Sequence, residues 1–217
     1  LGVGAQKAGT SWLHQQLSAR KDTDFGFLKE YHIFDALYHP EHACFKPKQP
    51  KPWKWRTWQR SRFIDNPERY FDYFEKKLSR KNICLTGDIT PSYACLTAKT
   101  YKLIRNEFKQ RNILTRSIFL MRDPIERFLS QHRMQLRKMR KLKPEYESDY
   151  LRNASIKLPK RNCLRSNYPA TIDALKAGLN IDEVFIGLYE TMFSPGEHNQ
   201  LCNFLQISGQ KSNLTQR

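Results

Sequence analysis

The sequence has 217 residues, of which 39% are hydrophobic and 12% aromatic, and its formal net charge at pH 7 is +17. This length suits one domain over residues 1–217 that buries about 70% of its unfolded surface, and the hydrophobic content excludes a disordered chain. The sequence contains no apolar run of about 18 residues or more, which excludes a transmembrane helix within it, and the positive charge favours anionic partners.

The first predicted elements are a strand at residues 1–4 and a helix at residues 10–19. Between them, residues 3–12 read VGAQKAGTSW, with Gly4 and Gly9 spaced as in the P-loop GxxxxGK[ST]. An apolar strand, a loop of small residues and a helix start together point backbone N–H groups at an anion. The segment therefore predicts a site for a phosphate or a phosphosulfate.

The position of the lysine in this loop distinguishes it from that of a nucleoside triphosphatase. Thr10 stands where the P-loop lysine belongs, and Lys7 lies inside the loop. From there Lys7 can reach an oxygen on which negative charge develops during group transfer. The alternative is a surface lysine in an ordinary turn.

A short second strand is predicted at residues 25–28, followed by the segment KEYHIFD. Glu30 stands at the mouth of that strand and is the candidate general base, because proton abstraction from an acceptor needs a carboxylate within hydrogen-bond reach. His32 can orient the acceptor or share the proton. An ion pair between Glu30 and Lys29, and a structural role for His32, are the alternatives.

Residues 36–62 interrupt the pattern and are predicted to form a surface insertion. The segment has four prolines and three of the four tryptophans, and residues 45–62 hold seven cations and no acid. Either an anionic partner or a solvated basic face explains the charges. Tryptophans among cations are also typical of nucleic-acid-binding modules.

The rest of the chain continues to alternate helix and strand, which predicts an α/β domain with a mainly parallel sheet. Asp123, Pro124 and Glu126 form a strong helix start. We expect helices at residues 67–79, 97–108, 123–143, 168–178 and 194–205, strands at 83–86, 116–121 and 184–188, and a lid at 143–165.

A second phosphate site is predicted where the strand at residues 116–121 meets the next helix. Arg122 ends the strand and Ser130 lies about two helical turns further on, so both side chains can face one terminal phosphate. A structural salt bridge of Arg122 is the alternative. The same helix continues into residues 133–143, which hold six cations and no acid.

The five cysteines, at positions 44, 84, 95, 163 and 202, are widely spaced. None forms a CxxC or a Cys/His pattern with zinc-ligand spacing, so we expect no metal site. Cys84 and Cys95 adjoin apolar segments and are predicted to be small core residues. This favours a reducing compartment and hence the cytoplasm.

Three segments in this order resemble those of sulfotransferases that use 3′-phosphoadenosine-5′-phosphosulfate (PAPS). They are the loop around Lys7, the KEYHIFD segment, which is similar to KEPHFFD of the heparan sulfate glucosaminyl (N-/3-O-) sulfotransferases, and the strand and helix that carry Arg122 and Ser130. The resemblance implies a P-loop-like three-layer fold with a mainly parallel central sheet. It also implies sulfuryl transfer from PAPS to a hydroxyl or amine without a metal.

The resemblance and the charge pattern together suggest a role for each candidate residue. Glu30, Lys7 and His32 are expected to be catalytic. The PAPS-binding residues are expected to be Lys7, Ala8, Gly9, Thr10, Ser11, Trp12, Arg122 and Ser130, and the acceptor-binding residues Lys29, Asp35, Tyr93, Arg133 and Arg137. Lys211 is a candidate for a loop that covers the cofactor.

One position departs from the family pattern. Glycan sulfotransferases of this type carry a lysine near the acceptor, where this chain has Ile89. A carbohydrate or another anionic molecule remains the expected acceptor, with no specific nucleic acid as partner. A small-molecule kinase and a nucleic-acid- or polyanion-binding module are the alternative functions. An upstream anchor removed from the sequence would place the protein in the Golgi lumen.

Overall fold

The computed structural model describes residues 1–48, 50–138 and 164–207. They form an α/β fold around a parallel sheet in the order β1-β2-β3. The strands are β1 (Gly2–Gly4), β2 (Ser117–Met121) and β3 (Val184–Leu188). The helices are α1 (Thr10–Ser18), α2 (Phe34–Tyr38), η1 (Pro40–Phe45), α3 (Trp55–Asp65), α4 (Glu68–Leu78), η2 (Pro91–Cys95), α5 (Ala98–Gln110), α6 (Pro124–Lys138), α9 (Tyr168–Gly178), η3 (Ile181–Glu183) and α10 (Pro195–Leu205).

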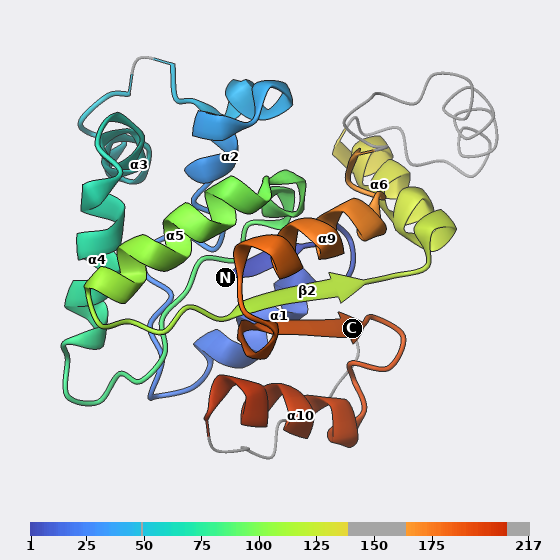
Figure 1. Cartoon of the computed structure of the whole chain (residues 1–217). Helices are drawn as coiled ribbons and strands as arrows, with labels where there is room; N and C mark the ends of the chain where they lie inside the picture. Colours follow the sequence, from blue (N-terminus) through green and yellow to red (C-terminus); the bar gives the residue numbers. More distant parts are fainter. Residues whose placement is uncertain (49, 139–163, 208–217) are drawn as a thin grey trace.

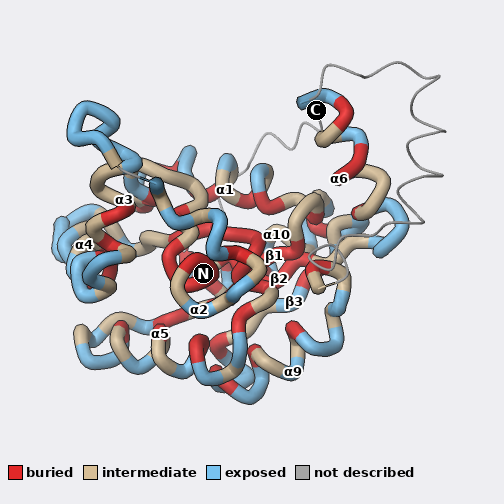
Figure 2. The backbone as a smooth tube through the Cα atoms, turned by 90° about the horizontal axis from the view of Figure 1, so that it is seen from above, coloured by how far each residue is buried: buried red, intermediate tan, exposed pale blue. Residues whose placement is uncertain are grey.

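The molecule has three layers, because the sheet lies between α5 and α9 on one face and α1 on the other (Figures 1 and 2). Figure 2 shows the buried residues concentrated around β1 and β2, with the exposed residues on the outer helices. Val3 in β1 and Phe119 and Leu120 in β2 are almost fully buried. Burial of a parallel sheet on both faces explains why these strands read as continuous apolar runs. The expected fold class is therefore confirmed.

The strand register brings together the ends that matter for function. Gly2 pairs with Ile118, and Met121 pairs with Leu188 at the other end of the sheet. The strands run parallel, so the loops after Gly4, Met121 and Leu188 all leave from the same edge. Ligands of open parallel sheets bind at the carboxyl ends of the strands, which is where the predicted site residues lie.

The predicted strands at residues 25–28 and 83–86 are wrong. Thr23 and Leu85 form only an isolated parallel bridge. Gly26 has a φ of 77°, which turns the backbone out of the extended conformation. Phe27 instead packs among aromatic rings, 5.5 Å from Tyr73 and 5.2 Å from Trp55 between ring centres. Side-chain packing, not a ladder of hydrogen bonds, holds this segment.

Residues 36–62 contain η1 and most of α3, with Trp53 and Trp55 exposed, and their description as a surface insertion stays a prediction. One further expectation needs correction. Cys84 is exposed and its thiol donates to the Asp22 carbonyl, so it is not a core residue. Cys95 is half-buried. The predicted lid at 143–165, the end of the helix to residue 143, Cys163 and Lys211 lie mostly or wholly outside the described residues.

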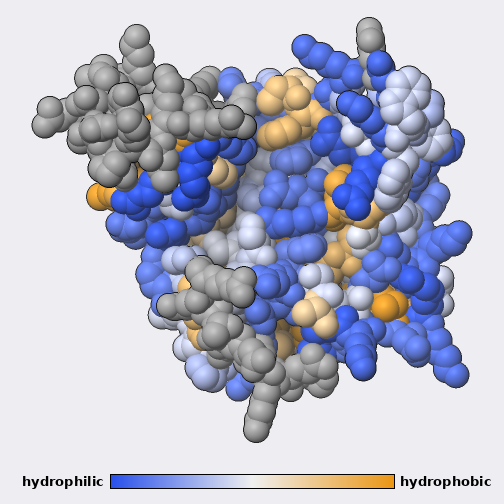
Figure 3. Space-filling model, turned by 180° about the vertical axis from the view of Figure 1, so that it is seen from behind, coloured by the Kyte–Doolittle hydropathy of each residue, from blue (hydrophilic) through white to orange (hydrophobic). Residues whose placement is uncertain are grey.

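The surface agrees with the composition. The face seen from behind is covered mainly by hydrophilic side chains, with small separate hydrophobic patches (Figure 3). Among the described residues, no helix is long and apolar enough to cross a membrane.

Candidate active site

The loop between β1 and α1 is held in the form of an anion cradle. Gly9 caps α1 with a φ of 86°, and a Cβ atom at this position would lie 2.7 Å from the Met192 sulfur, so only glycine fits. Gly9 supplies no side-chain cap, which leaves the first N–H groups of α1 open to an anion. Lys7 also has a positive φ, 70°, a conformation that a residue with a side chain adopts only at some cost.

Positive charges converge on this loop. The pKa of Lys7 is lowered, first by burial and then by the charges of Arg137, Arg122, Lys29 and Lys138. The largest electrostatic contributions to that shift all come from cations. Cations that destabilise one another in this way are stabilised when an anion binds between them. The electrostatics of the loop therefore favour the binding of a multiply charged anion.

Arg122 lies directly beside this loop. Its Nη1 atom donates to the Lys7 carbonyl at 3.3 Å, and its guanidinium lies 4.4 Å from the centre of the Tyr189 ring. The ion pair with Glu126, also 3.3 Å, is a weak restraint because half of the Glu126 side chain is exposed. Ser130 is half-buried on α6, whose start is capped by two hydrogen bonds to the Asp123 carboxylate, as predicted.

The segment after residue 28 places a carboxylate next to the loop. Glu30 accepts from Lys29 Nζ at 2.8 Å and contacts His32 Nε2 at 3.3 Å. Lys29 Nζ also donates to Ser11 Oγ at 3.0 Å, so this lysine connects Glu30 to the first turn of α1. The candidate base and the anion cradle are thus joined by one side chain.

Glu30, His32 and Asp35 form a carboxylate–imidazole–carboxylate chain. His32 Nδ1 lies 2.7 Å from Asp35 Oδ2, and Ser92 also donates to Asp35. Burial lowers the pKa of His32, but the bonds to Asp35 and Glu30 outweigh burial and raise it to about 9. Burial likewise opposes ionisation of Glu30, yet His32 and Lys29 bring its pKa down to about 2. At neutral pH all three groups are charged and satisfy one another.

Two of the residues expected to bind an acceptor lie in the core. The Tyr93 ring has no exposed surface, and its hydroxyl donates to Asp88 at 2.8 Å. Asp35 is equally buried, so it orients His32 and has no surface for an acceptor. Asp88 accepts from Thr90, Tyr70 and Tyr93 in a buried network, which makes it a structural carboxylate.

Ile89 is buried beneath β1, where its side chain lies so close to Gly2 that a Cβ on Gly2 would come within 2.7 Å of it. A lysine in this position would have to place its charge in the core. The departure from the glycan-enzyme pattern therefore reflects how this segment packs, and the acceptor side lacks that lysine. Arg133 and Arg137, by contrast, are exposed on α6, and Arg137 is close enough to shift the pKa of Lys7.

The structure adds neighbours that the sequence did not indicate. Arg165 donates from Nη1 to Gln6 Oε1 at 2.6 Å, a contact between residues 159 positions apart. The Tyr168 hydroxyl donates to the Arg122 carbonyl at 2.8 Å. Phe45 stacks on His32 with ring centres 3.8 Å apart. Only Tyr168 had a local signal, since it begins a helix of clear pattern; the other contacts are purely tertiary.

A cavity of 640 Å³ lies where β1 and β2 begin, and its lining includes Leu1, Thr115 and Arg116. Asp88 and Ile89 also line it, but Lys7, Glu30 and Arg122 do not. The cavity therefore takes no part in the candidate active site.

The fold is similar to that of a solved structure. The chain is similar to a sulfotransferase from Alicyclobacillus acidocaldarius, with a TM-score of 0.62 and 19% sequence identity, over 95% of this chain and 79% of that one. The chain has a sulfotransferase fold. No family model and no curated protein sequence matches it. At this identity the likeness concerns the fold, and the reaction must be argued from the site.

Proposed function

We propose that the protein is a PAPS-dependent sulfotransferase that sulfates a hydroxyl or amine, with a carbohydrate as the favoured acceptor. The observation that carries the proposal is the group of cations around the open N-terminus of α1, next to the charged chain Glu30–His32–Asp35. PAPS has negative charge at both ends, and this protein offers cations at Lys7 and at Arg122. The sulfotransferase fold supports the proposal.

The donor-binding residues fit such a nucleotide. The N–H groups of Thr10, Ser11 and Trp12 and the loop around Ala8 and Gly9 would hold the 5′-phosphosulfate. Arg122 and Ser130 would hold the 3′-phosphate, since a guanidinium and a hydroxyl suit a terminal phosphate. When bound, PAPS supplies the sulfuryl group, whose bond to the phosphate oxygen breaks as a bond from sulfur to the acceptor forms.

Each of the catalytic residues has a distinct task. Lys7 stabilises the charge that develops on the bridging oxygen of the leaving bisphosphate. Glu30 accepts the proton of the acceptor on a carboxylate oxygen. His32, which Asp35 positions, orients that carboxylate through its contact with Glu30. A pKa of about 2 makes Glu30 a weak base while Lys29 is bonded to it. A bound sulfuryl group near Ser11 would attract Lys29 away, which raises the pKa of Glu30 when the donor is in place.

The two alternative functions make different demands on this site. A kinase needs a lysine at the start of α1, where Thr10 is buried instead. A nucleic-acid-binding module is favoured only by the exposed Trp53 and Trp55 with nearby Lys51 and Arg56, and it leaves the charged chain at Glu30 unexplained.

Transfer of label from radioactive PAPS tests the proposal directly. The acceptor panel should contain neutral oligosaccharides, glycans with uronic acids, sulfated glycans, a phenol and an aliphatic amine. We expect label on a carbohydrate, and at least about 100-fold less label with Glu30→Gln in the same time. Label on the phenol alone would contradict the carbohydrate acceptor, and no transfer to any member would contradict sulfotransferase activity.

A further inference from the structure

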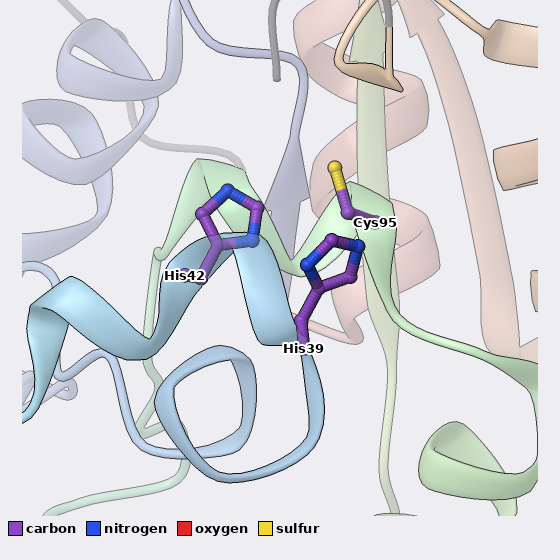
Figure 4. A group of neighbouring side chains, drawn as sticks. All are labelled: His39, His42 and Cys95. Atoms are coloured by element: carbon purple, nitrogen blue, oxygen red, sulfur yellow. The ribbon is translucent and has the colours of Figure 1, made fainter. Parts of the chain in front are cut away.

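Two histidines and a cysteine from distant parts of the chain lie close together beside Phe45, the residue whose ring stacks on His32. His39 precedes η1 and His42 lies within it, while Cys95 ends η2 (Figure 4). The 3₁₀ turn has three residues per turn, so side chains three positions apart lie on one side. The rings of His39 and His42 are accordingly 4.6 Å apart between centres. One potential ligand atom from each of the three residues lies within 4.8 Å of the others.

We propose that His39, His42 and Cys95 bind a divalent transition metal ion, with Zn²⁺ as the ion that fits them best. Imidazole nitrogen and thiolate sulfur are the ligands that Zn²⁺ prefers, and carboxylate-seeking ions such as Mg²⁺ and Ca²⁺ are disfavoured. Three protein ligands leave a fourth tetrahedral position for water. Because Zn–N and Zn–S bonds are about 2.0 to 2.3 Å long, the three atoms must approach one another by roughly 1 Å when the ion binds.

Burial favours the metal-binding form of His39 and opposes that of Cys95. His39 Nδ1 is buried without a hydrogen-bond partner, and burial lowers the pKa of His39, so a neutral ring offers its lone pair. Within the described parts of the chain, the Cys95 thiol takes part in no hydrogen bond or disulfide, and burial raises its pKa to about 11. Binding therefore breaks the S–H bond, forms the metal–sulfur bond and releases the proton to solvent.

The surrounding charges both favour and oppose an ion here. Asp35 acts electrostatically on His39, His42 and Cys95, and Glu41 acts on His39, so two carboxylates favour a cation. Arg165 opposes it, because its Nη2 atom lies 3.4 Å from His42 Nε2. The same guanidinium lowers the pKa of Cys95, which favours the thiolate. Metal binding is expected to shift Arg165 away from His42 while its bond to Gln6 is retained.

The site would act on the neighbouring segment. The Phe45 ring lies between His42, at 5.8 Å, and His32, at 3.8 Å, and is nearly parallel to both. An ion that ties η1 to η2 would hold Phe45 against His32. The cysteine spacing along the sequence gave no sign of this site, because His42 and Cys95 are brought together only by the fold. The proposal does not depend on the sulfotransferase assignment.

Cobalt(II) is the probe for this site, because its thiolate complexes have a charge-transfer absorption that histidine-only sites lack. The full chain, reduced and freed of metal with a chelator, should bind one Co²⁺ with that absorption and with the visible bands of tetrahedral cobalt. One equivalent of Zn²⁺ should remove both, since Zn²⁺ binds more tightly. Cys95→Ser should abolish the charge-transfer band. His39→Gln should weaken binding by more than about 100-fold, beyond the usual loss of an outer-shell partner.

Cys44→Ser and Cys84→Ser are matched controls, because both thiols are exposed and Cys44 is only two residues from His42. Both variants should keep the cobalt spectrum. Thermal unfolding of the metal-free variants shows whether a variant that no longer binds cobalt is still folded. His39→Gln, at a partly exposed position, provides a second variant if Cys95→Ser is unstable. The proposal is overturned if wild type shows no thiolate band, if Cys95→Ser retains it, or if Cys44→Ser loses it.

Discussion

The two ends of the candidate site differ in how their charges are balanced. At the end proposed to bind the donor, Lys7 has further cations around it, which make the largest electrostatic contributions to its lowered pKa. At the end proposed to bind the acceptor, the two carboxylates of Glu30 and Asp35 are balanced by the cations of Lys29 and His32 within hydrogen-bond distance. The donor end is therefore completed only by an anion, whereas the acceptor end is stable without a ligand and must be disturbed before it can react.

Lys29 is the residue through which the two ends communicate, since it contacts both Ser11 and Glu30. This difference predicts that variants at the donor end change binding, while variants at the acceptor end change turnover or stability.

Glu30→Gln should have the largest effect. The amide keeps the shape of the side chain but cannot take a proton, so turnover should fall by about 10² to 10⁴, the usual contribution of a general base. Affinity for adenosine 3′,5′-bisphosphate should stay within a factor of about three, because Glu30 is not expected to touch the nucleotide. A factor of three corresponds to less than about 1 kcal/mol of binding free energy. Near-normal turnover on the best acceptor would remove Glu30 from the mechanism.

His32→Asn should remove a pH-dependent part of stability. The pKa of His32 is raised from 6.5 to about 9, so its contribution is complete below pH 6.5 and lost as the pH rises through 9. This corresponds to about 3 kcal/mol at most for a coupled group of this kind. Denaturant unfolding from pH 6 to 10 should show a decline in wild type that the variant lacks. Asparagine is the replacement of choice because it tolerates the positive φ of this position.

His198 provides the matched control for that experiment. Burial lowers its pKa, so His198→Gln should leave the decline between pH 6.5 and 9 intact. An unchanged decline in His32→Asn would show that His32 is not held as an imidazolium between two carboxylates.

Arg122→Ala should weaken binding of adenosine 3′,5′-bisphosphate by about 1.5 to 3 kcal/mol, the range for a hydrogen bond to a charged group. Adenosine 5′-phosphate, which lacks the 3′-phosphate, should lose much less. Calorimetric titration of both ligands measures the difference. Equal losses would mean that Arg122 supports the loop through the Lys7 carbonyl and does not bind the 3′-phosphate.

Lys29→Gln tests the connection between the two ends. Lys29 lowers the pKa of Glu30, so its removal should raise that pKa and move the acid limb of the kcat/KM profile to higher pH. The alkaline limb of the profile should stay at the same pH. If the acid limb also stays at the same pH, Glu30 is not the group that accepts the proton.

The exposed cations of α6 should contribute least. Arg137 and Lys138 lower the pKa of Lys7, which places their charges near the donor. Replacing both with Gln should weaken bisphosphate binding by about threefold at low salt, with the difference vanishing as salt screens it. Lys102→Gln, an exposed cation on α5, should change nothing. If only the acceptor KM changes, these cations serve the acceptor instead.

The elements with strong local signals were predictable from the sequence. The strand at Val184–Leu188 and the helix at Tyr168–Gly178 have the predicted bounds, because apolar runs and a proline at a helix start are local features. Residues 25–28 were not, since their aromatic side chains pack against Trp55 and Tyr73, which the local pattern cannot reveal.

The same distinction holds within the site. The positions of Lys7 and Gly9 in one loop could be predicted because the loop is contiguous in sequence, and the ion pair of Glu30 with Lys29 because the two residues are adjacent. The burial of Tyr93 and the contacts of Arg165 with Gln6 and of Phe45 with His32 depend on tertiary packing. Sequence spacing indicates which residues can meet, but the core decides which of them remain accessible.

One calorimetric comparison tests most directly whether Lys7 and Arg122 bind the two ends of the donor nucleotide. Adenosine 3′,5′-bisphosphate, adenosine 5′-phosphate, ATP and a random oligonucleotide should be titrated into the wild-type chain at the same salt concentration. A donor end with cations at both Lys7 and Arg122 predicts that the bisphosphate binds at least about tenfold more tightly than the other nucleotides, which is about 1.4 kcal/mol. Equal affinity for the bisphosphate and adenosine 5′-phosphate, or tighter binding of ATP or the oligonucleotide, would contradict the account.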